Sequence, residues 1–291
     1  GYIEGINSEN NKNIKFNSGI IRIVDNRLIF DNFNVGFYQG YFKIKGIVNN
    51  FLTHPLGDLT INLNNINLDK INTIIPTVNP VSSGLKTGKI VFRNDSIKLE
   101  GFSFNYNTMP VYLNAKVKNL YSAKILEADF STILNETTAD NIINPYLTYP
   151  VKIKGEVPLK GTFKGNSDDY SISFHTDIPI ESDIQFGGAN INDGIFRRQI
   201  EGRIDVKGNI ATIDNLKLIK FIKNQNNRIN PIDALKVSGR VIQKQGDIYY
   251  DNFKVATQVP INVRMLNLVF KKSLLKQGNF ECSLNINGNL K

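Results

Sequence analysis

The sequence predicts an all-β protein, mostly antiparallel, built from repeated bulged hairpins with one or two short helices. Two observations support this fold class. A seventeen-position pattern occurs four times without an internal gap, at residues 19–35, 88–104, 202–218 and 239–255. Between these copies, apolar and polar residues alternate in stretches that are broken by Gly or Pro. Alternation with a period of two is typical of strands with one buried face.

Each copy of the pattern begins with Gly and carries turn-forming residues at positions +6 and +7 after it. These pairs are Asp25-Asn26, Asn94-Asp95, Gly208-Asn209 and Gln245-Gly246. Asn, Asp and Gly are favoured in the two-residue turns of β-hairpins. If the pair is the centre of such a turn, position +4 faces +9 and position +2 faces +11. Apolar side chains then meet across the hairpin on one face.

An acidic residue stands at +12 in every copy, followed by Asn or Gly. The four acids are Asp31, Glu100, Asp214 and Asp251. Apolar residues at +9 and +11 are followed by others at +14 and +16, and this step of three would turn the second pair to the opposite face. One extra residue in a β-bulge at +12 and +13 keeps both pairs on the same face. The leading Gly would face this bulge, where a residue without Cβ fits easily.

The apolar positions of the four copies form the candidate functional surface, because they extend one apolar face from hairpin to hairpin. They are Ile21, Ile23, Leu28, Phe30, Phe33, Val35, Ile90, Phe92, Ile97, Leu99, Phe102, Phe104, Ile204, Val206, Ile213, Leu216, Leu218, Val241, Ile248, Tyr250, Phe253 and Val255. Such a face must be covered by a second sheet, by helices or by a ligand. Physical considerations alone favour a sandwich or a sheet closed on itself.

The remaining elements are predicted from local pattern. Further strands are expected at residues 41–48, 111–117, 151–163, 170–180 and 261–268. One short helix is expected at 68–75, before Pro76, and another within 127–147, where Ile133, Leu134, Ile142 and Ile143 could form an apolar stripe. No strong linker interrupts the pattern, so one continuous domain over residues 1–291 is expected.

The sequence contains little that indicates catalysis. There are two histidines, His54 and His175, and one cysteine, so no metal cluster or intrachain disulfide is predicted. The repeated acids could supply oxygen ligands to calcium, but each copy offers one carboxylate, and a structural role at the bulge is favoured. Phe102 and Phe104 resemble a base-stacking platform, yet aliphatic residues replace them in other copies. We therefore expect no catalytic residue, metal, cofactor or nucleic-acid partner.

Charge and chain context allow several partners. Residues 215–291 hold 13 Lys or Arg and 4 Asp or Glu, so this last quarter carries all of the net charge of +9. Such a region suits anionic lipid headgroups, nucleic acid or no specific partner. No run approaches 18 apolar residues. The chain starts at Gly1, without Met and in the middle of a pattern, and we expect it to be a segment of a longer protein.

The repeated hairpin, together with strands that end in an apolar residue, a spacer and Gly, resembles the AsmA-like superfamily, including the TamB and YhdP proteins of Gram-negative envelopes. Such strand ends are Ile44-Lys45-Gly46, Ile153-Lys154-Gly155, Val237-Ser238-Gly239 and Ile286-Asn287-Gly288. The segment from Tyr149 to Gly161, YPVKIKGEVPLKG, is also similar to the periplasmic region of that family. The resemblance covers most of the chain and implies a long, curled β-sheet with an apolar groove.

The resemblance also implies a function: a non-enzymatic segment that carries phospholipid through the periplasm, between the inner and outer membranes, with acyl chains in the groove. It implies an inner-membrane anchor in a part of the protein outside this chain. The alternative is a scaffold for outer-membrane protein biogenesis, which would receive client strands at exposed sheet edges and could contact other outer-membrane assembly proteins. Retention of lipid would separate the two functions.

Overall fold

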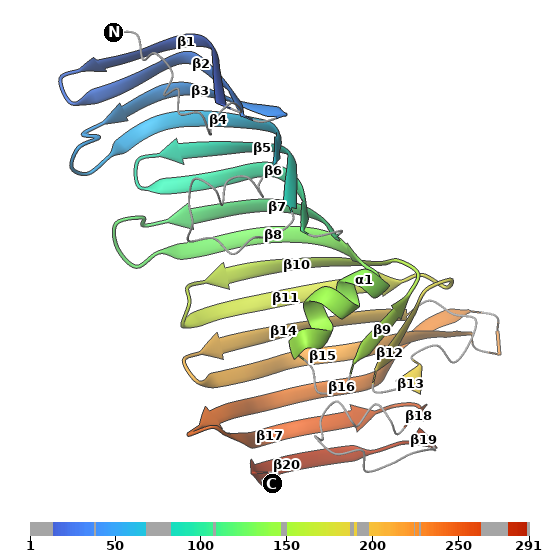
Figure 1. The fold of residues 1–291 in the computed structure, drawn as a ribbon. Coiled ribbons are helices and arrows are strands. Elements are labelled where there is room, and N and C mark those ends of the chain that lie inside the picture. The colour runs from blue at the N-terminus through green and yellow to red at the C-terminus, as the bar shows by residue number, and fades with distance from the viewer. Residues whose placement is uncertain are drawn as a thin grey trace. The chain divides into compact units, whose positions relative to one another are not determined.

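The computed structural model describes residues 14–37, 39–67, 83–106, 109–146, 150–186, 189–190, 198–223, 225–226, 228–262 and 279–289. Its main element is a 15-stranded antiparallel sheet made of successive hairpins, shown in Figure 1. The strand order is β1-β2-β3-β4-β5-β6-β7-β8-β10-β11-β14-β15-β16-β17-β20. The predicted all-β fold of repeated, bulged hairpins with one short helical region is confirmed.

The chain divides into two compact units, Gly1–Phe130 and Ser131–Lys291. The strands that begin in the first unit are β1 (Ile14–Val24), β2 (Arg27–Phe37), β3 (Gly40–Asn49), β4 (Leu56–Asn67), β5 (Ser83–Arg93), β6 (Ser96–Tyr106), β7 (Met109–Lys118) and β8 (Ile125–Leu134). Neighbours in sequence are also neighbours in the sheet, and all except β4 and β5, which residues 68–82 separate, are joined by two to six residues.

The second unit adds a short helical region and two small sheets to its part of the main sheet. The helical region is α1 (Glu136–Thr138), the π-helical turn η2 (Ala139–Ile143) and the 3-10 turn η3 (Asn144–Tyr146). The strands of the main sheet are β10 (Val157–Gly165), β11 (Asp169–Ile178), β14 (Arg198–Lys207), β15 (Ile210–Lys223), β16 (Ile229–Lys244), β17 (Asp247–Thr257) and β20 (Ser283–Asn289). The small sheets contain β9 (Val151–Lys154), β12 (Asp183–Phe186) and β13 (Ala189–Asn190), and β18 (Ile261–Asn262) with β19 (Asn279–Phe280).

The predicted hairpin register is present in all four copies of the pattern. The two residues at +6 and +7 form the turn, +4 pairs with +9, and +2 pairs with +11. The pairs are Ile23–Leu28 and Ile21–Phe30, Phe92–Ile97 and Ile90–Leu99, Val206–Ala211 and Ile204–Ile213, and Gln243–Ile248 and Val241–Tyr250.

The predicted bulge is also present in all four copies. In each, the residues at +13 and +14 lie opposite the single leading Gly. The residue at +13 has a left-handed backbone: φ is 47° for Asn32, 59° for Gly101, 60° for Asn215 and 49° for Asn252. Asn and Gly tolerate this conformation better than other residues, which explains why only they occupy this position.

The leading Gly is required because the chain at +14 lies over it. In the fourth copy Gly239 has φ +128°, and a Cβ there would lie 2.5 Å from the carbonyl oxygen of Asn252 and from Cα of Phe253. In the second copy a Cβ on Gly88 would lie 3.0 Å from the ring of Phe102. A large apolar residue at +14 thus fills the space that the glycine leaves.

The triplets of apolar residue, spacer and Gly form the other side of the bulge. Ile44 pairs with Phe33 and Gly46 pairs with Phe30, so Lys45 alone lies opposite Asp31 and Asn32. The triplets that end in Gly239 and Gly288 pair in the same way with β15 and β17. The fourth triplet, 153–155, ends β9 in a small sheet instead. Each of these three triplets therefore lies on the strand next to a seventeen-position pattern, opposite its bulge.

The position of the second predicted helix is wrong in its first half. Residues 127–134 belong to strand β8, which includes Ile133 and Leu134, and the helical region begins after Asn135. The side chain of Asn135 caps it by accepting a hydrogen bond from the Thr138 N–H at 3.0 Å. The other predicted helix, at 68–75, lies outside the described residues.

The other predicted strands are largely confirmed. Those at 41–48, 111–117 and 170–180 correspond to β3, β7 and β11, and 151–163 is divided into β9 and β10. Only residues 261–262 of the last predicted strand are described, and they form β18.

Candidate functional site

In the first unit, the apolar positions of the pattern join residues of intervening strands in continuous rows across the sheet. One row crosses six strands, β2 to β7, and spans about 24 Å at the usual spacing of about 4.8 Å between strands. Its members are Phe33, Ile44, Ile61, Ile90, Leu99 and Ala115, each paired with the next. A shorter parallel row joins Val35, Phe42 and Leu63.

The second unit repeats this arrangement. One row crosses β10 to β16 of the main sheet and contains Phe163, Ile172, Ile204, Ile213 and Gly239. Another joins Ile200, Leu218 and Leu235. The register places the 22 predicted residues on one face within each unit, which we call the apolar face.

The apolar face is only partly buried. Among the 22 predicted residues, four are buried, namely Val35, Leu218, Phe253 and Val255, and Ile23 is 68% exposed. The other 17 are half-buried. Side chains between two packed layers are normally buried almost completely. A large share of this face is therefore accessible to a ligand.

Part of the apolar face in the second unit is covered by the chain itself. Figure 1 shows α1 and β9 in front of the main sheet. Ala139 of η2 and Val151 and Ile153 of β9 form one buried cluster with sheet residues that include Leu218 and Ala234. Arg198 of β14, 2% exposed, forms a buried ion pair with Asp183 of β12 at 3.5 Å. The helical region and the small sheet thus act as a local second layer.

Sequence reasoning missed the residues that the intervening strands add to the apolar face. Ile44, Ile61 and Leu63 lie on β3 and β4, outside the seventeen-position pattern. The alternation of Leu59, Ile61 and Leu63 was a usable signal for β4. The row to which such a residue belongs depends on which strands pair, and that is not local information.

The opposite face of the first unit is mostly polar, although Ile47 and Val91 also lie on it. Lys89, at +1 of the second copy, lies opposite Glu100 at +12, and their side chains form an ion pair of 2.9 Å. Lys98 contacts the same carboxylate at 2.7 Å. Hydrogen bonds from Lys98 and Lys89 lower the pKa of Glu100 from its ordinary value of 4.5 to about 2. In the fourth copy, Arg240 and Asp251 form the equivalent pair.

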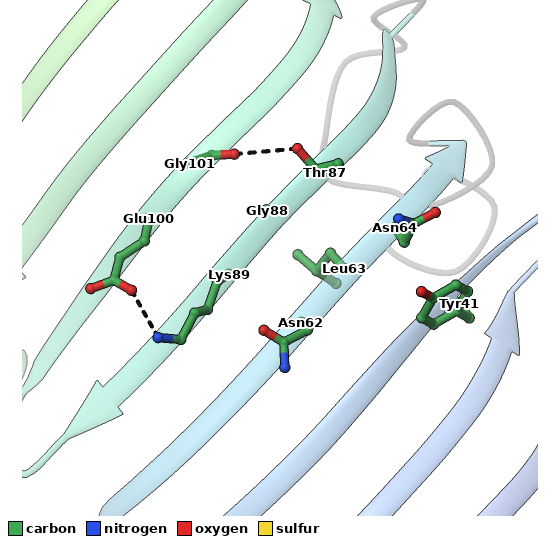
Figure 2. A pocket seen from close by; sticks show the side chains of 9 residues that line it. All are labelled: Tyr41, Asn62, Leu63, Asn64, Thr87, Gly88, Lys89, Glu100 and Gly101. Atoms are coloured by element: carbon green, nitrogen blue, oxygen red, sulfur yellow. Dashed lines mark hydrogen bonds and ion pairs between the residues drawn. The ribbon is translucent and has the colours of Figure 1, made fainter.

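A pocket in the first unit lies around the bulge of the second copy of the pattern. Figure 2 shows Tyr41, Asn62, Leu63, Asn64, Thr87, Gly88, Lys89, Glu100 and Gly101 lining it. Thr87 donates a hydrogen bond to the Gly101 carbonyl at 3.4 Å, and the Lys89 ammonium group donates one to the Glu100 carboxylate at 2.9 Å. The charged groups that line the pocket are thus paired with each other.

The acids of the pattern and the histidines do not form a metal site in the part of the chain that the structure describes. His175 contacts Asp177 through Nε2 at 3.5 Å and Glu201 through Nδ1 at 3.7 Å. The two carboxylates thus lie on different sides of the ring and do not converge on one point. Among the same residues, no helix is long and apolar enough to cross a membrane.

The chain was compared with protein-family models, with curated proteins and with solved structures. None of the three comparisons found a match.

Proposed function

We propose that this chain is a non-enzymatic lipid-binding segment, whose apolar face holds the acyl chains of phospholipids while the headgroups stay in water. The observation that carries the proposal is the accessible apolar face, with its continuous rows and its 17 half-buried residues. A row without polar interruption offers an acyl chain similar contacts at each strand.

The energetic reason for such a face is the cost of moving an acyl chain through water. Exposing about 15 methylene groups costs roughly 12 kcal/mol, at about 0.8 kcal/mol for each group. Contact with a row such as Ile44, Ile61 and Ile90 removes much of that cost. Because the contacts are not directional, a lipid could slide along the row without a specific pocket.

The wider setting is part of the same proposal. We place the segment in the periplasm of a Gram-negative envelope, within an AsmA-like protein that carries phospholipid between the inner and outer membranes and is anchored outside this chain. The support is the repeated hairpin pattern and the apolar face that its bulges maintain.

The second candidate is a scaffold for outer-membrane protein assembly. It is favoured by the outermost strands of the described sheet, β1 and β20, which could pair with an added strand. Ile20 of β1 is 52% exposed, so an added strand could gain apolar contacts there.

Two measurements on the purified chain test lipid binding. Mass spectrometry of an organic extract should find phospholipid retained by the protein. A photoreactive phenylalanine derivative at position 61, on the apolar face, should cross-link to that lipid. The same group at position 60 is the matched control, because Thr60 is half-buried on the same strand but lies on the opposite face.

Lipid cross-linked at position 61 and much less at 60 supports the proposed function. Absence of lipid in the extract, combined with no uptake of a fluorescent phospholipid, would contradict it. Binding of unfolded outer-membrane protein segments by such a lipid-free chain would favour the scaffold.

A further inference from the structure

The hairpin ends of the first unit carry apolar side chains that point into solvent. We call the ends at residues 23–26, 50–56, 94–95 and 119–124 the tip ridge; they lie at the left of β1 to β8 in Figure 1. Leu52 is 75% exposed, Ile23 is 68% exposed and Tyr121 is 49% exposed. Val24 and Leu56 are also exposed. Five exposed apolar side chains on neighbouring hairpin ends are more than the scattered ones found on most surfaces.

Hydrogen bonds between the hairpin ends hold the tip ridge in order. The side chain of Asn26 accepts from the Leu52 N–H at 3.4 Å, and the Tyr121 hydroxyl donates to the carbonyl of Pro55. The Asn94 N–H donates to the Gly57 carbonyl at 2.8 Å, and the Leu120 N–H to the Asp95 carbonyl at 3.0 Å. The exposed side chains therefore stand on an ordered base, so less ordering is needed when they bind.

The hairpin ends of the second unit provide an internal comparison. The ends at residues 166–168, 208–209 and 245–246 consist of polar residues and Gly. They are also tied to their neighbours, for example by the hydrogen bond from the Gly208 N–H to the Asp168 carbonyl at 2.6 Å. The two-residue turns of the first unit, 25–26 and 94–95, are polar as well, and its exposed apolar side chains lie beside a turn or in and next to the six-residue connections 50–55 and 119–124. Formation of the turns does not itself require exposed apolar residues.

Two exposed cations lie beside the apolar side chains of the tip ridge, whose own acidic residues are Asp25, paired with Arg27 at 3.6 Å, and Asp95. Arg22 precedes Ile23 on β1, and Lys124 follows the turn that contains Tyr121. Both are exposed and form no ion pair with described residues. Exposed Ile and Leu beside a Tyr ring and unpaired cations suit the boundary between anionic headgroups and acyl chains.

We propose that the tip ridge docks the chain onto an anionic phospholipid surface. Leu52, Val24 and Leu56 enter the boundary between headgroups and acyl chains, and Arg22 and Lys124 contact lipid phosphates. This docking is distinct from the proposed lipid-binding function of the apolar face. Only Ile23 belongs to both surfaces, and for that reason it is left unchanged in the test.

The test is flotation of the full chain with vesicles of phosphatidylcholine that contain phosphatidylglycerol. Leu52→Ser should weaken binding about tenfold, because one exposed leucine no longer enters the membrane. Ile229→Ser is the matched control, since Ile229 is 59% exposed in the second unit and lies at the opposite end of β16 from the turn at 245–246. This control variant should bind like the unchanged chain.

Charge is tested separately. Arg22→Glu and Lys124→Glu should each weaken binding roughly fivefold or more on the anionic vesicles, whereas Lys160→Glu, in the second unit, should not. Vesicles of phosphatidylcholine alone should bind more weakly, and the difference should shrink at high salt.

Three results would overturn the docking proposal. The first is that the unchanged chain does not float with anionic vesicles. This result would overturn the proposal also if Leu52→Ser changed the self-association of the chain. The second is that Leu52→Ser and Ile229→Ser bind equally well. The third is that Leu52→Ser also abolishes lipid cross-linking at position 61, because the substitution then disturbs the apolar face. Flotation lost while cross-linking remains supports docking, and flotation without cross-linked lipid contradicts only the proposed function of the apolar face.

Discussion

At the residue scale, the acid at +12 is part of a charge pair on the polar face. Position +1 lies opposite it in every copy, and in three copies that position is basic: Lys89, Arg203 and Arg240. The sequence contained this signal, because the two positions keep a fixed separation. The calcium alternative weighed for these acids thus gives way, for Glu100 and Asp251, to cross-strand ion pairs.

Glu100 gives a prediction about stability and pH. Hydrogen bonds from Lys98 and Lys89 lower its pKa from 4.5 to about 2 in the folded chain. A depressed folded-state pKa means that the stabilisation is present above pH 4.5 and is lost as pH falls from there towards 2. The unchanged chain should therefore be more stable than Glu100→Gln near neutral pH, and this difference should disappear in acid. Urea unfolding across that range measures it, and a difference independent of pH would contradict the assignment.

At the element scale, the bulge keeps the apolar residues at +11 and +14 on one face. Asn252 is at its centre, with φ 49°, and its N–H donates to the side chain of Asn287 at 2.8 Å. The Asn252 side chain also donates to Asp251 at 3.1 Å, but Gly101 has the same conformation in the second copy without a side chain, so the backbone determines which residues are accepted. Without the extra residue, Phe253 and Val255 would turn to the polar face.

This requirement predicts opposite results for two substitutions at one position. Asn252→Val should lower the free energy of unfolding by about 1–2 kcal/mol, because a β-branched residue is strained in the left-handed region. Asn252→Gly should be tolerated, since Gly adopts that conformation readily. Lys254→Val, on the same strand but extended and exposed, should change the free energy by about 0.5 kcal/mol or less. Equal losses for Asn252→Val and Lys254→Val in urea unfolding would argue against backbone strain.

The elements also show what could be predicted from sequence. Turns and bulges depend on a few adjacent residues, such as Asp25-Asn26 and Asn32, and their register followed from spacing alone. The strand at 127–134 could not be separated from a helix, because Ile133 and Leu134 suit either. The layer over the second unit depends on contacts such as that of Arg198 with Asp183, which local patterns do not encode.

At the scale of the whole molecule, strand order follows chain order in the main sheet apart from the strands of the small sheets. Each main-sheet strand therefore pairs with neighbours that are close in sequence. Folds of this kind have stabilities that approximate a sum of local contributions. The two compact units, Gly1–Phe130 and Ser131–Lys291, are consistent with such local stabilisation.

Hydrogen exchange tests this locality. Gly46 in β3 has φ +133°, and a Cβ there would collide with the carbonyl oxygen of Asp58 in β4. Gly46→Ala should lower the local opening free energy by about 1–3 kcal/mol, which speeds exchange in β2 to β4 by roughly 5- to 150-fold. Exchange in β15 to β17 should stay unchanged. Gly84→Ala is the control, because a Cβ at Gly84 meets nothing within 4 Å. Equal acceleration in both units would instead mean that the described sheet opens as one cooperative body.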